Sequence, residues 1–244
     1  MKTVLIVQAR MTSTRLPGKV LKPVLGKPLL SYQIERLSRV KLADELVIAT
    51  TTNETDQPII DLCIKLKTPY SRGSENDVLA RYYWAAKEYN ADTVVRVTSD
   101  CPVIDPGVVD KIIHYYNVRR PLYDYVSNTL DRSYPRGMDT EVFSADVLKE
   151  IFLEAVAPAD REHVTPFIYK NPERYKLANV TNNSDESRHR WTVDTVEDYE
   201  LIKKIIEALY PKNPNFLMDD ILRLFESHPD WFLINSHIEQ KPVF

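Results

Sequence analysis

The chain has few cysteines and glycines, and it has no long apolar run. Of its 244 residues, two are cysteine and five are glycine. Cys63 and Cys101 stand in unrelated contexts, which is typical of a reduced cytoplasmic protein and not of a disulfide framework. No stretch approaches the ~18 apolar residues of a membrane span, and the apolar start after Lys2 is too short for a signal-peptide core. The sequence therefore predicts a cytosolic protein with no membrane partner.

A strongly basic balance is also missing. The 32 lysines and arginines are outnumbered by 35 aspartates and glutamates, which gives a net charge of −3 and a pI near 6.0. Proteins that bind nucleic acid usually carry a basic face, so nucleic acid is not an expected partner. A chain of this length can bury a full core and usually forms one domain. We therefore predict a single domain over residues 1–244.

Apolar strands and amphipathic helices alternate along the first half of the chain. The predicted strands cover 3–7, 45–50 and 93–97, and the predicted helices cover 28–39, 56–67, 77–89 and 108–116. Short alternation of this kind favours a mostly parallel, twisted sheet with right-handed crossovers. The expected fold class is α/β, with helices flanking the sheet in three layers.

The pattern changes after about residue 120. Strands are predicted over 123–127 and 140–143 on either side of a loop, and helices over 145–155 and 161–170, so 120–145 is expected to be a small β-rich excursion. A late strand over 190–193 is predicted to return to the sheet and to lead into a helix carrying Tyr199 to Leu209. The last stretch, 230–244, is poorly patterned and is expected to be a tail at an interface.

The most informative segment is the loop from Gln8 to Lys19, which directly follows the first strand. It gathers three cations and three hydroxyls, namely Arg10, Arg15, Lys19, Thr12, Ser13 and Thr14. Open α/β sheets bind their ligands at the carboxyl ends of strands. A dense set of cationic donors there favours a polyanion such as a nucleoside triphosphate, although an arbitrary loop with three cations is more often simply solvated.

The same loop does not match a P-loop, although it contains Gly18 followed by Lys19. A P-loop reads G-x-x-x-x-G-K-[ST], in which glycine comes first and Ser or Thr follows the lysine. Here Ser13 occupies the first position and Val20 follows the lysine. The P-loop interpretation is therefore rejected.

Two aspartates follow apolar segments later in the chain. Asp100 comes after the predicted strand that ends at Val97, and Asp194 comes after the one that ends at Val193. Either carboxylate alone could equally cap a turn or a helix. Together with a phosphate-binding loop they suit Mg²⁺, which prefers one or two carboxylates completed by phosphate oxygens and water.

These segments together resemble the cytidylyltransferases that activate acidic sugars, such as the 3-deoxy-manno-octulosonate and acylneuraminate cytidylyltransferases. The family motif A-R-x-x-S-[TK]-R-x-P-x-K stands here as Ala9 to Lys19. The motif G-D-x-P is matched by Ser99 to Pro102, with serine in place of glycine, and V-D-T-x-E-D by Val193 to Asp198. Two further stretches, Gly73 to Arg81 and Pro135 to Asp139, resemble the spore-coat polysaccharide branch.

The resemblance implies a nucleotide-diphospho-sugar transferase-like, Rossmann-type fold. It implies that CTP and an acidic sugar give a CMP-sugar and pyrophosphate in surface polysaccharide biosynthesis, with a homodimer as the working form and 120–145 shaping the sugar site or the dimer. The site residues that it implies are Arg10, Arg15 and Lys19 for catalysis, Asp100 and Asp194 for Mg²⁺, Ala9, Ser13, Arg72 and Asn76 for the nucleotide, and Arg136, Asp139, His163 and Arg190 for the acceptor. On its own, a histidine such as His163 is more often structural.

Other functions remain open at this stage. The enzyme could be a nucleotidyltransferase that uses another base or another acceptor, such as a sugar phosphate or a phosphonate. A glycosyltransferase of the related fold would use a D-x-D metal motif, and the strand end offers only Ser99 and Asp100. A non-catalytic nucleotide-binding protein is disfavoured, because it has no chemical need for Arg15, Lys19 and both aspartates together.

Overall fold

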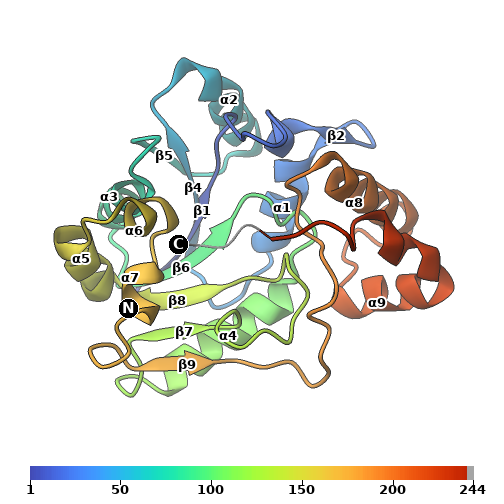
Figure 1. The fold of residues 1–244 in the computed structure, drawn as a ribbon. Coiled ribbons are helices and arrows are strands. Elements are labelled where there is room, and N and C mark those ends of the chain that lie inside the picture. Colours follow the sequence, from blue (N-terminus) through green and yellow to red (C-terminus); the bar gives the residue numbers. More distant parts are fainter. Residues whose placement is uncertain (241–244) are drawn as a thin grey trace.

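A seven-stranded sheet forms the centre of the computed structural model, which describes residues 1–240 (Figure 1). Its strands are β1 (Thr3–Gln8), β4 (Glu45–Thr51), β5 (Tyr70–Gly73), β6 (Thr93–Thr98), β7 (Tyr125–Ser127), β8 (Glu141–Ser144) and β9 (Leu177–Asn179). They lie in the order β5-β4-β1-β6-β8-β7-β9, and β8 alone runs antiparallel to both of its neighbours. The predicted mostly parallel sheet is confirmed.

Helices cover both faces of this sheet, as the prediction of three layers requires. They are α1 (Leu29–Leu37), α2 (Gln57–Leu66), α3 (Val78–Glu88), α4 (Pro106–Val118), α5 (Ala145–Glu154), α6 (Pro158–His163), α7 (Pro166–Tyr169), α8 (Val196–Leu209) and α9 (Met218–Ser227). Successive side chains of a strand point to opposite faces. Leu5 and Val7 of β1 therefore pack with α1, α2, α4, α8 and α9, whereas Val4 and Ile6 pack with α3, α5 and α7.

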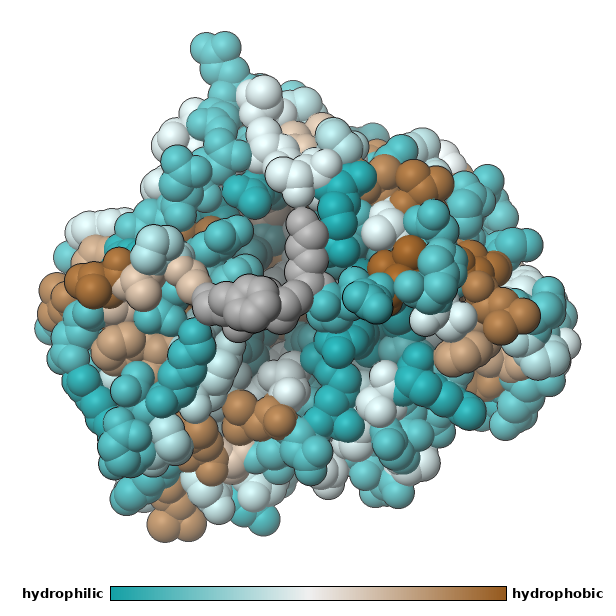
Figure 2. Space-filling model, viewed as in Figure 1, coloured by the Kyte–Doolittle hydropathy of each residue, from teal (hydrophilic) through white to brown (hydrophobic). Residues whose placement is uncertain are grey.

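The register of the two central strands sets the position of the predicted site. β1 and β6 are parallel neighbours, and Gln8 at the end of β1 pairs with Thr98 at the end of β6. The basic loop that starts at Ala9 and the segment that carries Asp100 therefore leave the sheet side by side. In Figure 2, hydrophobic residues gather over α5 on one side of the view and over α8 and α9 on the other.

The predicted strand over 190–193 is wrong. That segment forms only one isolated bridge, between Arg136 and Arg190, and is not part of the sheet. Its backbone forms hydrogen bonds with two different loops: Trp191 N–H donates to Arg136 O, and Val193 N–H donates to Asp100 O. Because each partner loop offers a single pairing position, no strand ladder develops. The parallel edge strand is instead β9, which the sequence pattern did not indicate.

The predicted helix over 161–170 is divided in two. α6 ends at His163, Val164 has φ of 73°, and Pro166 opens α7. Proline has no N–H for a continuing helix and tolerates only its first turn, so the helix restarts there. The prediction also missed α9, which buries Met218, Ile221 and Phe225 at helical spacing, and the short hairpin of β2 (Pro23–Val24) and β3 (Lys27–Pro28).

The predicted excursion over 120–145 contains β7 and β8, so it is β-rich and extends the main sheet. The predicted tail forms a 3-10 helix over Pro229–Ile234, and Asn235 behind it is buried against the rest of the chain; residues 241–244 lie outside the described part.

The homodimer and the cytosolic location stay predictions. Within residues 1–240, none of the helices is both long and apolar enough to cross a membrane.

Candidate active site

The basic loop is folded back on itself by one glycine. Gly18 has φ of 68°, a conformation that side chains disfavour, and its N–H donates to Met11 O at 2.8 Å. The turn brings the next residue, Lys19, to the start of a short 3-10 helix. The Lys19 ammonium is thereby aimed at the loops that follow β6 and precede α8.

The loop is anchored by Asp56, a residue that the sequence prediction missed. Asp56 is fully buried, and its carboxylate accepts hydrogen bonds from Met11 N–H at 2.8 Å, from the Thr51 hydroxyl at 2.6 Å and from the Thr50 hydroxyl at 3.2 Å. It therefore ties the loop after β1 to the end of β4. A buried aspartate just after a strand end was the available signal, but its partner Met11 is distant in sequence.

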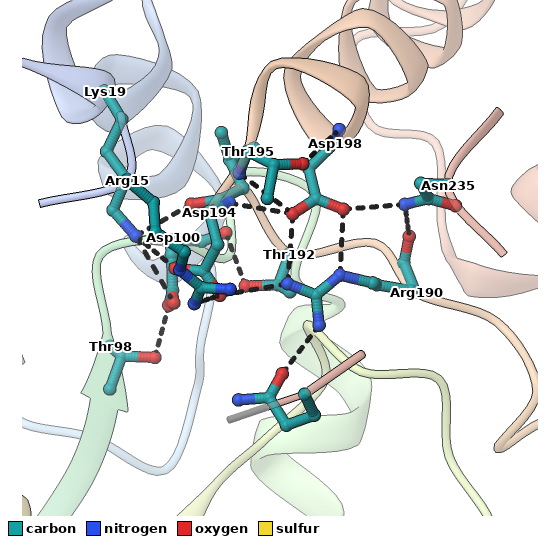
Figure 3. Close-up of polar contacts among 12 residues, drawn as sticks. Arg15, Lys19, Thr98, Asp100, Arg190, Thr192, Asp194, Thr195, Asp198 and Asn235 are labelled. Carbon is teal, nitrogen blue, oxygen red and sulfur yellow. Dashed lines mark hydrogen bonds and ion pairs between the residues drawn. The ribbon is translucent and has the colours of Figure 1, made fainter. Parts of the chain in front are cut away.

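Lys19 joins the two predicted metal ligands (Figure 3). Its Nζ lies 2.8 Å from Asp194 Oδ1 and 3.6 Å from Asp100 Oδ2, and it donates to Val193 O at 2.7 Å. Asp100 Oδ1 also accepts a hydrogen bond from the Thr98 hydroxyl. The network brings together side chains from the loop after β1, from the segment after β6 and from the segment before α8.

The ionic states of this cluster follow from its mutual contacts. Burial lowers the pKa of Lys19, but the carboxylates of Asp100 and Asp194 outweigh it and raise the pKa above its usual value. Burial raises the pKa of Asp100, but Lys19 and the Thr98 hydroxyl outweigh that effect and hold it below the usual range. The lysine and Asp100 are therefore charged at neutral pH.

Asp194 is surrounded by two further cations. Arg15 Nη2 and Arg190 Nη2 lie 2.8 and 3.0 Å from Asp194 Oδ2. Arg190 is itself held by Asp198, which is fully buried and completes a capping box with Thr195 at the start of α8. Helix capping of this kind fixes the entry of a helix. The structure therefore places Arg190 behind Asp194, and its predicted contact with the acceptor stays a prediction.

A cavity of about 500 Å³ opens over this cluster. The predicted residues that line it are Arg10, Ser13, Arg15, Lys19, Asp100, Arg136, Asp139, His163 and Asp194. They come from both halves of the chain, so the fold brings the basic loop, the two aspartates and the predicted acceptor residues to one cavity. Cys101 also lines it; both cysteines are free and buried, and burial beside Asp100 raises the pKa of the Cys101 thiol well above its usual value.

A second cavity of about 400 Å³ adjoins the first and shares part of its wall. Both are lined by Arg96, Thr98, Arg136, Asp139, His163 and Gln240. His163 is the last residue of α6, where the helix breaks, and burial lowers the pKa of its imidazole. Gln240 comes from the predicted tail and accepts a hydrogen bond from Arg190 Nη1 at 2.6 Å. The tail therefore closes one side of the site up to residue 240.

The remaining predicted nucleotide residues do not line the first cavity. Ala9 is buried and its N–H donates to Ala49 O at 3.0 Å. Arg72 is exposed at the end of β5 and donates through Nε to Thr51 O at 3.0 Å, while Asn76 is exposed in the loop before α3. Their roles stay predictions.

Arg136 differs from the other cations that line the two cavities. Arg15, Lys19 and Arg96 each form an ion pair with a carboxylate, and Arg10 lies 3.7 Å from Glu75. Arg136 has no ion pair within residues 1–240, although burial and the nearby Arg132 lower the pKa of its guanidinium. Its accessible guanidinium is therefore the one best placed to receive an external anion.

The backbone of Arg136 is locked to the segment that carries Asp194. Arg136 N–H donates to His189 O at 3.0 Å, and Trp191 N–H donates to Arg136 O at 2.7 Å. The following residue, Gly137, has φ of 103° and lies so close that an added Cβ would stand 2.5 Å from Trp191 O. Only glycine fits there, so the P-R-G-x-D stretch fixes Arg136 relative to the metal-binding aspartates predicted from the sequence.

Comparisons with known proteins agree with the motifs. The family model described as cytidylyltransferase matches residues 4–232. The chain is 35% identical over 243 residues to an uncharacterized protein of Methanocaldococcus jannaschii, with 99% of this chain and 97% of the relative covered. It is also 35% identical over 235 residues to the spore coat polysaccharide biosynthesis protein SpsF of Bacillus subtilis, with 92% and 94% covered.

The fold is shared with a solved relative. The structure of a cytidylyltransferase from Leptospira borgpetersenii matches with a TM-score of 0.91 and 33% identity, and covers 99% of this chain and 100% of that one. The predicted family resemblance, the fold class and the enzymatic nature of the protein are thus confirmed. This chain is a nucleotidyltransferase and belongs to the cytidylyltransferase family.

Proposed function

We propose that this enzyme transfers CMP from CTP to the hydroxyl of an acidic sugar, of the 2-keto-3-deoxy or nonulosonic acid type, and releases pyrophosphate. The product would serve surface polysaccharide biosynthesis, in keeping with the name of the Bacillus subtilis relative. The observation that carries the proposal is that one cavity is lined by paired cations and aspartates together with the unpaired Arg136.

The basic loop supports binding of the triphosphate. Arg10, Arg15 and Lys19 line the cavity beside the Ser13 hydroxyl. In nucleotidyl transfer, negative charge grows on the pyrophosphate as it leaves, so fixed cations at the β- and γ-phosphates stabilise the transition state. A triphosphate would also offer Arg15 and Lys19 new anionic partners in place of Asp194.

Asp100 and Asp194 fit the donor set of Mg²⁺. Their carboxylates lie on either side of one cation, the Lys19 ammonium, and Val193 O adds a third oxygen to the same position. Hard oxygen donors in this number, completed by phosphate and water, are what Mg²⁺ prefers. When bound, the metal would polarise the α-phosphate and favour ionisation of the attacking hydroxyl. Within residues 1–240, no group of three or more acidic, histidine or cysteine side chains is placed to hold a metal, so the triphosphate and water would have to supply the remaining ligands.

The second cavity supports a monoanionic acceptor. Its wall holds three guanidinium groups and two carboxylates. Arg96 pairs with Glu141, and Arg132 pairs with Asp139 through bonds of 2.6 and 2.8 Å. Arg136 is left as the uncompensated charge. One carboxylate balances one guanidinium, and the two have matching fork geometry. A dianionic sugar phosphate would bring a second charge for which this wall has no unpaired arginine.

The proposed reaction is an in-line displacement. The acceptor hydroxyl loses its proton to water, its oxygen forms a bond to the α-phosphorus, and the bond from that phosphorus to the bridging oxygen of the β-phosphate breaks. The electron pair of the broken bond leaves with pyrophosphate. Arg136 would hold the acceptor carboxylate, and a neutral His163 would bond to a sugar hydroxyl from the wall shared by both cavities. Fixing the two reactants in this geometry supplies much of the rate.

The test is pyrophosphate release from each of the four NTPs with Mg²⁺ and a panel of acceptors. We expect release with CTP only when a 2-keto-3-deoxy acid is present. Release without an acid sugar, a strong preference for UTP, or turnover of sugar phosphates in place of acids would overturn the proposal. Arg136→Gln is expected to raise KM for the acid about 10- to 100-fold, while Arg188→Gln, a solvent-exposed control, leaves it unchanged.

A further inference from the structure

Arg96 lies at the wall shared by the two cavities. It is a charged residue inside the apolar strand β6, where Val94 on the same face packs into the core and Thr98 borders the site. Its side chain is 13% exposed, and the Tyr82 ring lies beneath its guanidinium at 5.7 Å. The guanidinium therefore stands between the buried core and the space proposed for the acceptor.

Glu141 holds this guanidinium in place. The two residues are register partners on the antiparallel strands β6 and β8, and their side chains form an ion pair. The other carboxylate oxygen of Glu141 accepts from the Tyr125 hydroxyl at 2.5 Å and from the Thr165 hydroxyl at 2.6 Å. Because Thr165 follows the break after His163, the same carboxylate also supports the turn that presents His163 to both cavities.

The ion pair leaves hydrogen-bonding capacity on Arg96 unused. A guanidinium has five N–H donors, and Nη1 is the one paired with Glu141. The contact of Nη2 with Gln8 Oε1 is long, at 3.4 Å, and Nε has no acceptor within residues 1–240. A buried ion pair is seldom more stable than apolar residues of the same size, so stability alone gives little reason for one at a cavity wall.

We propose that Arg96 is a specificity-determining residue that donates a hydrogen bond to a hydroxyl of the acceptor sugar. Glu141 already balances the charge of Arg96, so a neutral oxygen suits it better than a carboxylate, which the unpaired Arg136 receives. The two arginines thus bind different groups of one molecule. This assignment rests on the proposed function, since it presumes a carboxylated polyol as the acceptor.

The experiment measures steady-state pyrophosphate release with the best acid acceptor at saturating CTP, together with calorimetric titration of CTP. In Arg96→Lys the pairing with Glu141 is kept and the planar fork is lost. We expect KM for the acceptor to rise about 10- to 100-fold, with CTP affinity unchanged. The double variant Arg96→Gln, Glu141→Gln leaves no lone buried charge, and it is expected to show the same rise.

Each result has a distinct meaning. Normal acceptor KM in the double variant would show that Arg96 only balances Glu141, and would overturn the assignment while leaving the proposed function intact. Absence of turnover by the wild type with every acid sugar would overturn both. Arg174→Lys is the matched control, because Arg174 also pairs with carboxylates, those of Glu150 and Glu154, but lines neither cavity, and it should change neither constant. An analogue lacking the contacted hydroxyl should bind wild type and Arg96→Lys alike.

Discussion

The Lys19 ammonium lies 2.8 Å from Asp194 Oδ1, at the meeting point of the first and the last motif of the chain. The same Nζ is 3.6 Å from Asp100 Oδ2. With Arg15 and Arg190 also on Asp194, both aspartates are charge-compensated by the protein's own cations before any ligand binds. A divalent cation must therefore compete with Lys19 for these carboxylates.

We expect Mn²⁺, used as a spectroscopic substitute for Mg²⁺, to bind weakly to the ligand-free enzyme. Lys19→Met removes the competing charge and should strengthen Mn²⁺ binding roughly tenfold or more, because the two carboxylates then lack that cation. Electron paramagnetic resonance of free Mn²⁺ measures this without turnover. Adding CTP should strengthen binding to the wild type, since the triphosphate draws Lys19 and Arg15 away from Asp194.

The control for this prediction is Lys22→Met, which removes a nearby lysine that lies over the Tyr199 ring and outside the carboxylate cluster. It should leave Mn²⁺ affinity at the wild-type value. Unchanged or weaker Mn²⁺ binding in Lys19→Met would show that the lysine does not compete with the metal.

Replacing Asp100 by asparagine is expected to lower turnover by about 10²-fold or more, because one charged oxygen ligand and one partner of Lys19 are lost together. Pyrophosphate release measures the turnover, and circular dichroism should show an intact fold. Asp146→Asn, on the exposed side of α5, is the matched control. Wild-type turnover in Asp100→Asn would remove this residue from the reaction.

The sequence could predict which segments meet at the candidate site wherever a motif followed a strand end. The basic loop and Asp100 follow neighbouring parallel strands, whose carboxyl ends meet at one edge of the sheet, and Lys19 lies 3.6 Å from Asp100. The segment before Asp194 was mistaken for a strand, since β-branched and aromatic residues are typical both of strands and of buried irregular chain. Its actual partners, Arg136 and Asp100, are distant in sequence.

The residues that sequence reasoning missed act through long-range contacts. Asp56 binds the backbone of Met11, and Arg96 pairs with Glu141 across two strands. Each contact joins residues that are far apart in the chain, so no local motif marks Asp56 or Arg96 as part of the site. The available signal for Arg96 was a cation at an apolar position of a central strand, which is costly to bury unless it is paired.

Gly137→Ala is expected to destabilise the protein and to weaken acceptor binding. Its φ of 103° disfavours any Cβ, and the added atom would stand 2.5 Å from Trp191 O. The strain alone costs on the order of 1–3 kcal/mol, and relieving the overlap would displace Arg136. The free energy of unfolding measured in urea should therefore fall, and KM for the acceptor should rise.

Gly26→Ala is the control that separates strain from overlap. Gly26 also has positive φ, at 75°, but an added Cβ there meets nothing within 4 Å. It should lower stability through strain without changing the acceptor KM. An acceptor KM in Gly137→Ala as low as that of Gly26→Ala would argue against the link between Gly137 and Arg136.

The stability of the enzyme should fall as the pH drops below about 6.5, the usual pKa of histidine. His189 is 4% exposed and packs against the rings of Trp191 and Phe225. Burial, and then the charge of Arg188, lower the pKa of its imidazole. The unfolded chain therefore binds a proton more readily than the folded one, and stability is lost as the pH falls from 6.5 toward the lowered folded pKa.

This pH dependence is measured by urea unfolding between pH 7.5 and pH 5. His189→Gln should flatten the decline, because glutamine takes up no proton in either state. His114→Gln, at an exposed position on α4, should keep the wild-type slope. His163, whose pKa burial also lowers, accounts for the decline that remains in His189→Gln. Equal slopes in wild type and His189→Gln would mean that His189 becomes protonated in the folded protein as readily as in the unfolded chain.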